Sequence, residues 1–253
     1  SLLEKLACHL VPDTKSPETI QILDERLLST PSVALVRCQE IAETMARISM
    51  DALKTGCHLL KQYDPKSAQA VRETEQEADQ YEDMLGTYLV KMGRSNLSDK
   101  DSRQVSKLLH IIGDFERISD HAVNLVESAE EMRNKGLNFS IYAKRELEIL
   151  TAAVSEIMDL SLEAFLKDDP SLAVKVEPLE EVVDTLKEQL RNRHILRLQK
   201  GECTIELGFV WSDLLTNLER VADHCSNIAG CIIEMSHDSL DVHEYLDNVK
   251  AGS

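Results

Sequence analysis

The chain has few of the residues that β-rich and cross-linked folds need. Aromatic residues make up only 4% of its 253 residues, and it contains 9 glycines and 6 prolines. Strands favour aromatic residues and their tight turns favour glycine, so this composition disfavours a β-sandwich and suits long helices. The six cysteines form no Cys-x-x-Cys pair and no recognisable disulfide framework, which indicates reduced thiols rather than a zinc site.

Long apolar runs and basic charge are also scarce. No segment approaches the roughly 18 apolar residues of a membrane-spanning helix, and no signal peptide is visible. Asp and Glu number 45 against 28 Lys and Arg, which gives a formal net charge of -17. Such a charge repels phosphate backbones, so we expect no nucleic-acid partner, no direct membrane insertion by this segment, and cations as natural ligands.

The sequence contains an internal repeat. The segment LLHIIGDFERISDHAVNL around Glu116 is similar to WSDLLTNLERVADHCSNI around Glu219, 103 positions later. Five polar residues keep their spacing in the two copies: Glu116, Arg117, Asp120, His121 and Asn124 correspond to Glu219, Arg220, Asp223, His224 and Asn227. Self-similarity at a fixed period predicts a duplicated unit packed against its copy.

Apolar periodicity and stop signals predict six long helices, over 33–62, 66–92, 99–134, 140–167, 171–200 and 205–237. Asp-Pro steps precede the second and fifth of these helices, Ser98 is placed to cap the third, and Gly136 follows its end. We therefore predict an all-α fold of two tandem three-helix bundles with pseudo-two-fold symmetry. The predicted organisation is a connector (1–32), a first repeat (33–136), a second repeat (137–238) and a C-terminal tail (239–253).

Four Glu-x-x-x-Asp pairs lie on the same flank of the core-facing stripes of their helices, at Glu75/Asp79, Glu116/Asp120, Glu180/Asp184 and Glu219/Asp223. One such pair is ordinary on a solvated helix face. Like charges at this spacing cost a helix about 0.2–0.5 kcal/mol per pair, so four equivalent pairs call for compensation by a cation. Carboxylate oxygens suit iron, manganese, magnesium or calcium, and oxygen-rich zinc sites also occur.

The residues beside these pairs have two interpretations each. His121 and His224 are rotated off the carboxylate face, which favours hydrogen-bonding partners over metal ligands. Arg117 and Arg220 either neutralise the acidic face or bind a partner. No nucleophile elbow and no glycine-rich phosphate loop is present, so we predict that the protein is not an enzyme.

The segments DFERISDHAVNL and NLERVADHCSNI resemble the paired signature of the PhoU proteins, regulators of bacterial phosphate uptake built as two three-helix repeats. The resemblance covers about residues 33 to 238. It implies multinuclear iron or zinc clusters held through the Glu/Asp-x-x-x-Asp motifs, one by the first two pairs and one by the last two. The segment LDERLLSTPSVAL at 23–35 is similar to the junction before the PhoU-like tail of bacterial sodium/phosphate cotransporter family proteins.

The two resemblances together imply a regulatory domain that tunes sodium-coupled phosphate uptake from the cytoplasmic face of the inner or plasma membrane. Its partner would be the membrane-spanning part of the same transporter, upstream of residue 1, and a homodimer is left open. The alternatives are a metal-free helical adaptor that docks a basic partner through its acidic face, or a metal-dependent hydrolase or oxidase using the same carboxylates.

Overall fold

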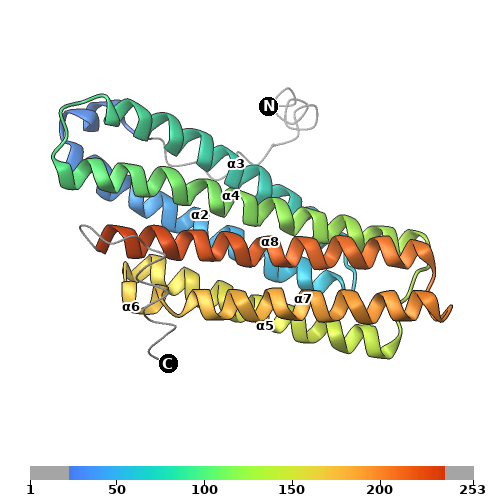
Figure 1. Cartoon of the computed structure of the whole chain (residues 1–253). Coiled ribbons are helices and arrows are strands. Elements are labelled where there is room, and N and C mark those ends of the chain that lie inside the picture. The colour runs from blue at the N-terminus through green and yellow to red at the C-terminus, as the bar shows by residue number, and fades with distance from the viewer. Residues whose placement is uncertain (1–22, 237–253) are drawn as a thin grey trace, which may run out of the picture.

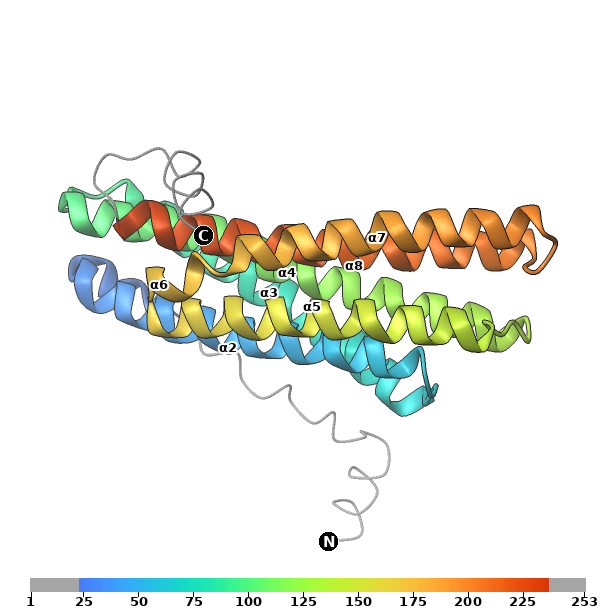
Figure 2. The same cartoon turned by 60° about the horizontal axis from the view of Figure 1, so that its bottom comes forward.

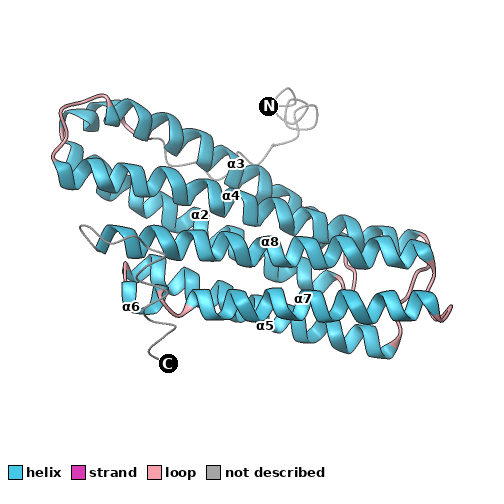
Figure 3. Cartoon of the chain, viewed as in Figure 1, coloured by secondary structure: helices cyan, strands magenta, loops and turns pink. Residues whose placement is uncertain are grey.

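The computed structural model describes residues 23–236, which form a short 3-10 helix and seven α-helices, with no strand in that range (Figure 3). The elements are η1 (Glu25–Ser29), α2 (Pro31–Leu59), α3 (Pro65–Gly93), α4 (Asp99–Asn134), α5 (Ile141–Lys167), α6 (Pro170–Ala173), α7 (Val176–Gln199) and α8 (Ile205–Ser236). The all-α prediction is confirmed, and the long helices end close to the predicted positions.

Local chemistry explains where the helices begin and end. The side chains of Asp64, Ser98 and Ser140 accept hydrogen bonds from backbone N–H groups in the first turns of α3, α4 and α5. Gly136 and Gly201, just beyond α4 and α7, have positive φ angles of 63° and 69°, a conformation that costs glycine little. These capping residues and glycines set the two ends of the helices independently of tertiary packing.

The single helix predicted over 171–200 is wrong, because the structure divides it into α6 and α7 at Val174 and Lys175. Pro178 gives the physical reason. It has no N–H, and its ring clashes with the carbonyl group four residues earlier in a continuous helix. A helix tolerates proline in its first turn, so α7 begins at Val176, two residues before Pro178.

The two predicted bundles are present, and they pack along their lengths (Figure 1). Helices α2, α3 and α4 form the first, and α5 to α8 form the second. Helices α4 and α8 lie side by side at the centre, and α2 also contacts α5, as the second view shows (Figure 2). The ring of Phe115 from α4 meets that of Phe165 from α5 edge-on at 5.1 Å between centroids, so the apolar core is continuous across both bundles.

An ion pair between a buried lysine and an exposed aspartate also joins the bundles. Lys107 of α4 has a side chain that is only 2% exposed, and its ammonium group pairs with Asp168 at the end of α5. Asp168 has a φ angle of 48°, in the left-handed region that few side chains adopt. This pair fixes the end of α5 against α4.

The described part of the predicted connector packs against the first bundle. Leu23 is buried, and the Tyr88 hydroxyl of α3 donates a hydrogen bond to the Asp24 carbonyl at 3.0 Å. Residues 1–22 and the predicted tail lie outside the described residues. None of the described helices combines the length and the apolar character needed to cross a membrane.

Candidate functional site

The structure brings the four predicted carboxylates of the first repeat together on neighbouring helices. We call this set patch 1: Glu75 and Asp79 of α3 with Glu116 and Asp120 of α4. Burial raises the pKa of Glu75, and the charges of Asp120 and Asp79 raise it further. Burial, followed by the charge of Asp120, raises the pKa of Glu116 to about 7. Patch 1 is therefore a partly buried site where negative charges lie close together.

Glu82 of α3 extends patch 1, and sequence reasoning missed it. Burial raises the pKa of Glu82, and the charges of Asp83 and Asp79 add to the effect. Glu82 in turn contributes to the raised pKa of Glu116. Arg117 lies along the patch, with its Nη1 3.2 Å from Asp120 Oδ2 and its Nε 3.4 Å from Glu116 Oε2.

The second repeat has an equivalent set, patch 2: Glu180 and Asp184 of α7 with Glu219 and Asp223 of α8. Burial raises the pKa of Glu180 to about 7, with further contributions from Glu177 and then Asp223. Burial also raises the pKa of Asp223, followed by the charge of Glu219. The predicted grouping of carboxylates on adjacent helices therefore holds in both repeats.

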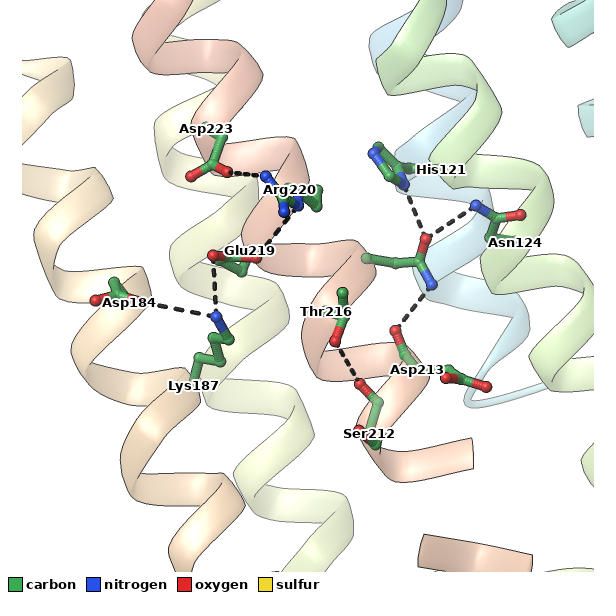
Figure 4. Close-up of polar contacts among 11 residues, drawn as sticks. His121, Asn124, Asp184, Lys187, Ser212, Asp213, Thr216, Glu219, Arg220 and Asp223 are labelled. Atoms are coloured by element: carbon green, nitrogen blue, oxygen red, sulfur yellow. Dashed lines mark hydrogen bonds and ion pairs between the residues drawn. The ribbon is translucent and has the colours of Figure 1, made fainter. Parts of the chain in front are cut away.

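Patch 2 contains a lysine that sequence reasoning also missed. The ammonium Nζ of Lys187 lies 2.9 Å from Glu219 Oε1 and 3.9 Å from Asp184 Oδ1, so it joins α7 to α8 (Figure 4). On the other side of Glu219, Arg220 contacts Asp223 at 3.2 Å. Lys187 follows Asp184 by three positions, as Glu82 follows Asp79, so the repeat spacing could have identified both.

The two arginines of the repeated motif act in the same way in both copies. Arg117 and Arg220 are each about 60% exposed and lie against the acidic pair on their own helix. Of the two interpretations of these residues, the contacts favour neutralisation of the acidic face. Because both guanidinium groups are well exposed, the neutralisation is screened by solvent.

Whether the patches hold a metal stays a prediction. In the described range 23–236, no three His, Cys, Asp or Glu side chains are placed to ligate a common metal ion. The donor chemistry of patch 1 fits a hard divalent cation, because it consists of carboxylates alone, and burial followed by neighbouring negative charge raises the pKa of Glu75 and Glu116. Patch 2 fits less well, because an ammonium group already contacts Asp184 and Glu219.

His121 and His224 bind across the interface between α4 and α8. His121 Nδ1 lies 2.8 Å from the side-chain oxygen of Asn217, and His224 Nδ1 lies 2.8 Å from Asp114 Oδ1. Asn124 also donates to Asn217 at 2.9 Å. The two imidazole rings face each other with centroids 5.6 Å apart. Both histidines therefore hold the repeats together, as expected of hydrogen-bonding partners.

An acidic cleft of about 630 Å³ opens between α4 and α8 beside patch 1. Its walls include Glu82 and Glu116 from the first repeat with Glu177 and Glu234 from the second. Ser226 donates a hydrogen bond to Glu177 at 2.6 Å within it. The cleft combines negative charge with an opening between two helices that carry the repeated motif.

The chain is similar to known proteins of phosphate transport. A family model described as the PhoU domain matches residues 42–129 and again 147–232. An accessory protein of the phosphate-specific transport system from Thermotoga maritima, a PhoU homolog, is 25% identical over 162 residues, 64% of this chain and 68% of that protein. A putative inorganic phosphate export protein, YjbB, from Escherichia coli O157:H7 is 21% identical over 230 residues, 88% of this chain but 41% of that protein.

Solved structures share the fold. PhoU from Pseudomonas aeruginosa superposes with a TM-score of 0.68 at 22% identity, covering 84% of this chain and 98% of that one. The regulatory PhoU protein of the phosphate transport system from Streptococcus pneumoniae superposes with a TM-score of 0.74 at 16% identity, covering 83% and 99%. The double match of the family model over most of the chain, together with the two bundles, shows that the protein belongs to the PhoU domain family.

Proposed function

We propose that this chain regulates the movement of phosphate through a membrane transporter, as a cytoplasmic, non-enzymatic domain attached to the transporter itself. The proposal is carried by the alignment with the export protein, which spans 88% of this chain but only 41% of that relative. The relative is thus much longer than this chain. The sequence of residues 23–35, similar to the junction in sodium/phosphate cotransporter family proteins, supports the same arrangement.

The interface between α4 and α8 is the element through which regulation would act. Each helix carries one copy of the repeated motif, with an acidic pair on one flank and a histidine hydrogen bond to the other repeat on the opposite flank. A change in charge at a patch therefore acts on the helix that positions the second bundle. A ligand that favours one packing of the two helices shifts the population toward it.

Transport measurements test this function directly. We expect that deletion of residues 23–236 from the full-length protein changes the sodium dependence, the rate or the phosphate response of transport. Both uptake and efflux of labelled phosphate must be measured, because the name of the relative states export, whereas the family resemblance implied uptake. Unchanged transport in both directions would contradict the proposal.

Metal binding is part of the proposal. Glu75, Asp79, Glu116 and Asp120 would hold the cation in patch 1, and its positive charge would relieve the repulsion from Asp120 that adds to the effect of burial on the pKa of Glu116. Elemental analysis of protein purified without an affinity tag should find iron or zinc. We expect the content to fall in Glu116→Gln and to stay unchanged in Glu163→Gln, a matched control on an exposed acid of α5.

A metal-free adaptor is the second candidate function, and the acidic cleft favours it. Glu82, Glu177 and Glu234 line an open groove that is complementary to a basic segment of a partner protein. Under this alternative, protein without metal would still bind the transporter, and binding would weaken steeply with salt. Retention of transporter binding after removal of all metal would favour the adaptor.

A further inference from the structure

The two acidic patches differ at one position. Glu180 and Asp184 follow Glu75 and Asp79 by 105 residues, and at the same spacing Lys187 replaces Glu82. The position therefore carries a negative charge on α3 and a positive charge on α7. At the same spacing Arg72 of α3 corresponds to Glu177 of α7, which is a sign change in the other direction.

The side chain of Lys187 is placed as a counter-ion within patch 2. It is 21% exposed, and its partner Glu219 is 16% exposed, so solvent screens their 2.9 Å contact much less than it screens a surface pair. The ammonium group also lies 3.9 Å from Asp184 on its own helix. One cation thus bridges a carboxylate of α7 and a carboxylate of α8, as Figure 4 shows.

Glu82, at the corresponding position of patch 1, adds negative charge where Lys187 adds positive charge. Glu82 adds to the negative charge around Glu116 and Asp79, and only the exposed Arg117 opposes it. Patch 1 therefore has five mutually repelling carboxylates with no ammonium group among them. In patch 2 Glu177 adds to the charge around Glu180 in the same way, but Lys187 contacts two of the carboxylates, Asp184 and Glu219.

This contact conflicts with a multinuclear cluster in patch 2. A metal that bridged Asp184 and Glu219 would have to displace the ammonium group from both, and the remaining pair, Glu180 and Asp223, offers few oxygens to replace them. A divalent ion beside a retained ammonium would meet charge repulsion at short range. The second repeat therefore does not fit the cluster that the family resemblance implies.

We propose that Lys187 is a built-in counter-ion that takes the place of a metal in patch 2, so that only patch 1 binds a divalent cation. The metal half of this inference rests on the proposed function. The consequence is a functional asymmetry between the repeats: α7 and α8 are held together permanently, whereas the charge balance between α3 and α4 depends on a ligand.

Substitutions that reverse the charge at Glu82 or at Lys187 test the inference. Manganese titration with detection of free Mn²⁺ by electron paramagnetic resonance counts the sites, because Mn²⁺ prefers oxygen ligands. We expect binding by the wild-type protein to be lost in Glu82→Lys and the number of ions per chain to double in Lys187→Glu. The inference is overturned if Lys187→Glu leaves the number unchanged, or if Glu180→Gln lowers it in the wild-type background.

A measurement of stability tests the counter-ion role of Lys187 independently of metal binding. In urea with excess chelator, Lys187→Met should lower the midpoint of unfolding, because it removes the ammonium group from Asp184 and Glu219, whereas Glu82→Met should raise the midpoint by removing repulsion. The wild-type protein could bind no Mn²⁺ while the two substitutions still shift the unfolding midpoint in opposite directions. In that case the metal part of the proposed function fails and the counter-ion role of Lys187 stands. If Lys187→Met does not lower the midpoint, the counter-ion role is overturned.

Discussion

At the scale of single residues, burial gives one histidine an unusual pKa. His194 of α7 is 5% exposed, and its ring stacks on the indole of Trp211 at 5.6 Å between centroids. Burial lowers the pKa of His194, and the guanidinium of Arg197 lowers it further, while Glu146 opposes the shift. Its Nε2 lies 4.0 Å from Cys203 Sγ.

The lowered pKa of His194 predicts a loss of stability in acid. Below about pH 6.5 this histidine is protonated in the unfolded chain but stays neutral in the native state. The unfolded state therefore binds more protons, and the free energy of unfolding falls as the pH falls. One proton contributes at most about 1.4 kcal/mol per pH unit. Urea unfolding between pH 7.5 and 5.5 should show a smaller loss for His194→Phe, which keeps an aromatic ring on Trp211.

His121 supplies the control for this measurement. Its pKa is also lowered, mainly by burial, so His121 contributes the same acid sensitivity to the wild-type protein and to His194→Phe, and the difference between the two reports on His194. An identical pH dependence of the wild-type protein and His194→Phe would show that His194 does not contribute.

At the scale of elements, α2 and α4 approach each other closely at one glycine. A Cβ atom on Gly56 would lie 3.1 Å from the Ala122 carbonyl oxygen and 3.3 Å from Leu125 Cβ. The nearest of these atoms belongs to the backbone of α4, which cannot move without shifting the helix. The crossing of α2 over α4 therefore depends on the absence of a side chain at this position.

Two alanine substitutions should have opposite effects on stability. Gly56→Ala forces α2 away from α4 and should destabilise the protein by about 1–3 kcal/mol. Gly113→Ala lies in the interior of α4, where the added Cβ would meet no atom of a neighbouring element within 4 Å, and it should stabilise the protein by about 0.5–1 kcal/mol. Thermal or urea unfolding measures both, and equal effects would contradict the close approach at Gly56.

At the scale of the whole molecule, the two bundles share one core and one central pair of helices. Phe115 packs on Phe165, Lys107 pairs with Asp168, and the histidines connect α4 to α8. Neither repeat can lose its structure without exposing apolar surface of the other. We therefore expect the two repeats to unfold as a single cooperative unit.

Cooperative unfolding can be tested with the single tryptophan. Trp211 lies in α8 and packs against Phe139 and His194, so its fluorescence reports on the second repeat. Its urea midpoint should coincide with that of far-ultraviolet circular dichroism, which reports on all helices. A Trp211→Phe, Tyr88→Trp variant moves the reporter to the first repeat. Its fluorescence midpoint should coincide with its own dichroism midpoint, and separate midpoints in either protein would indicate independent bundles.

The sequence alone determined the helices, the duplication and the acidic flanks. These features depend on periodicity, capping residues and repeat spacing, all of which act within one turn or one helix. The break between α6 and α7 was missed although its cause, Pro178, is equally local. The metal ligands themselves stay a prediction.

Only the tertiary structure decided which charges meet. Lys187 contacts Glu219, Lys107 contacts Asp168, and His224 contacts Asp114, all from residues that are far apart in the chain. Each contact depends on how two helices are rotated and shifted against each other. That arrangement follows from the packing of the shared core, because a rotation that buries the apolar stripes also fixes the direction of every side chain on their flanks.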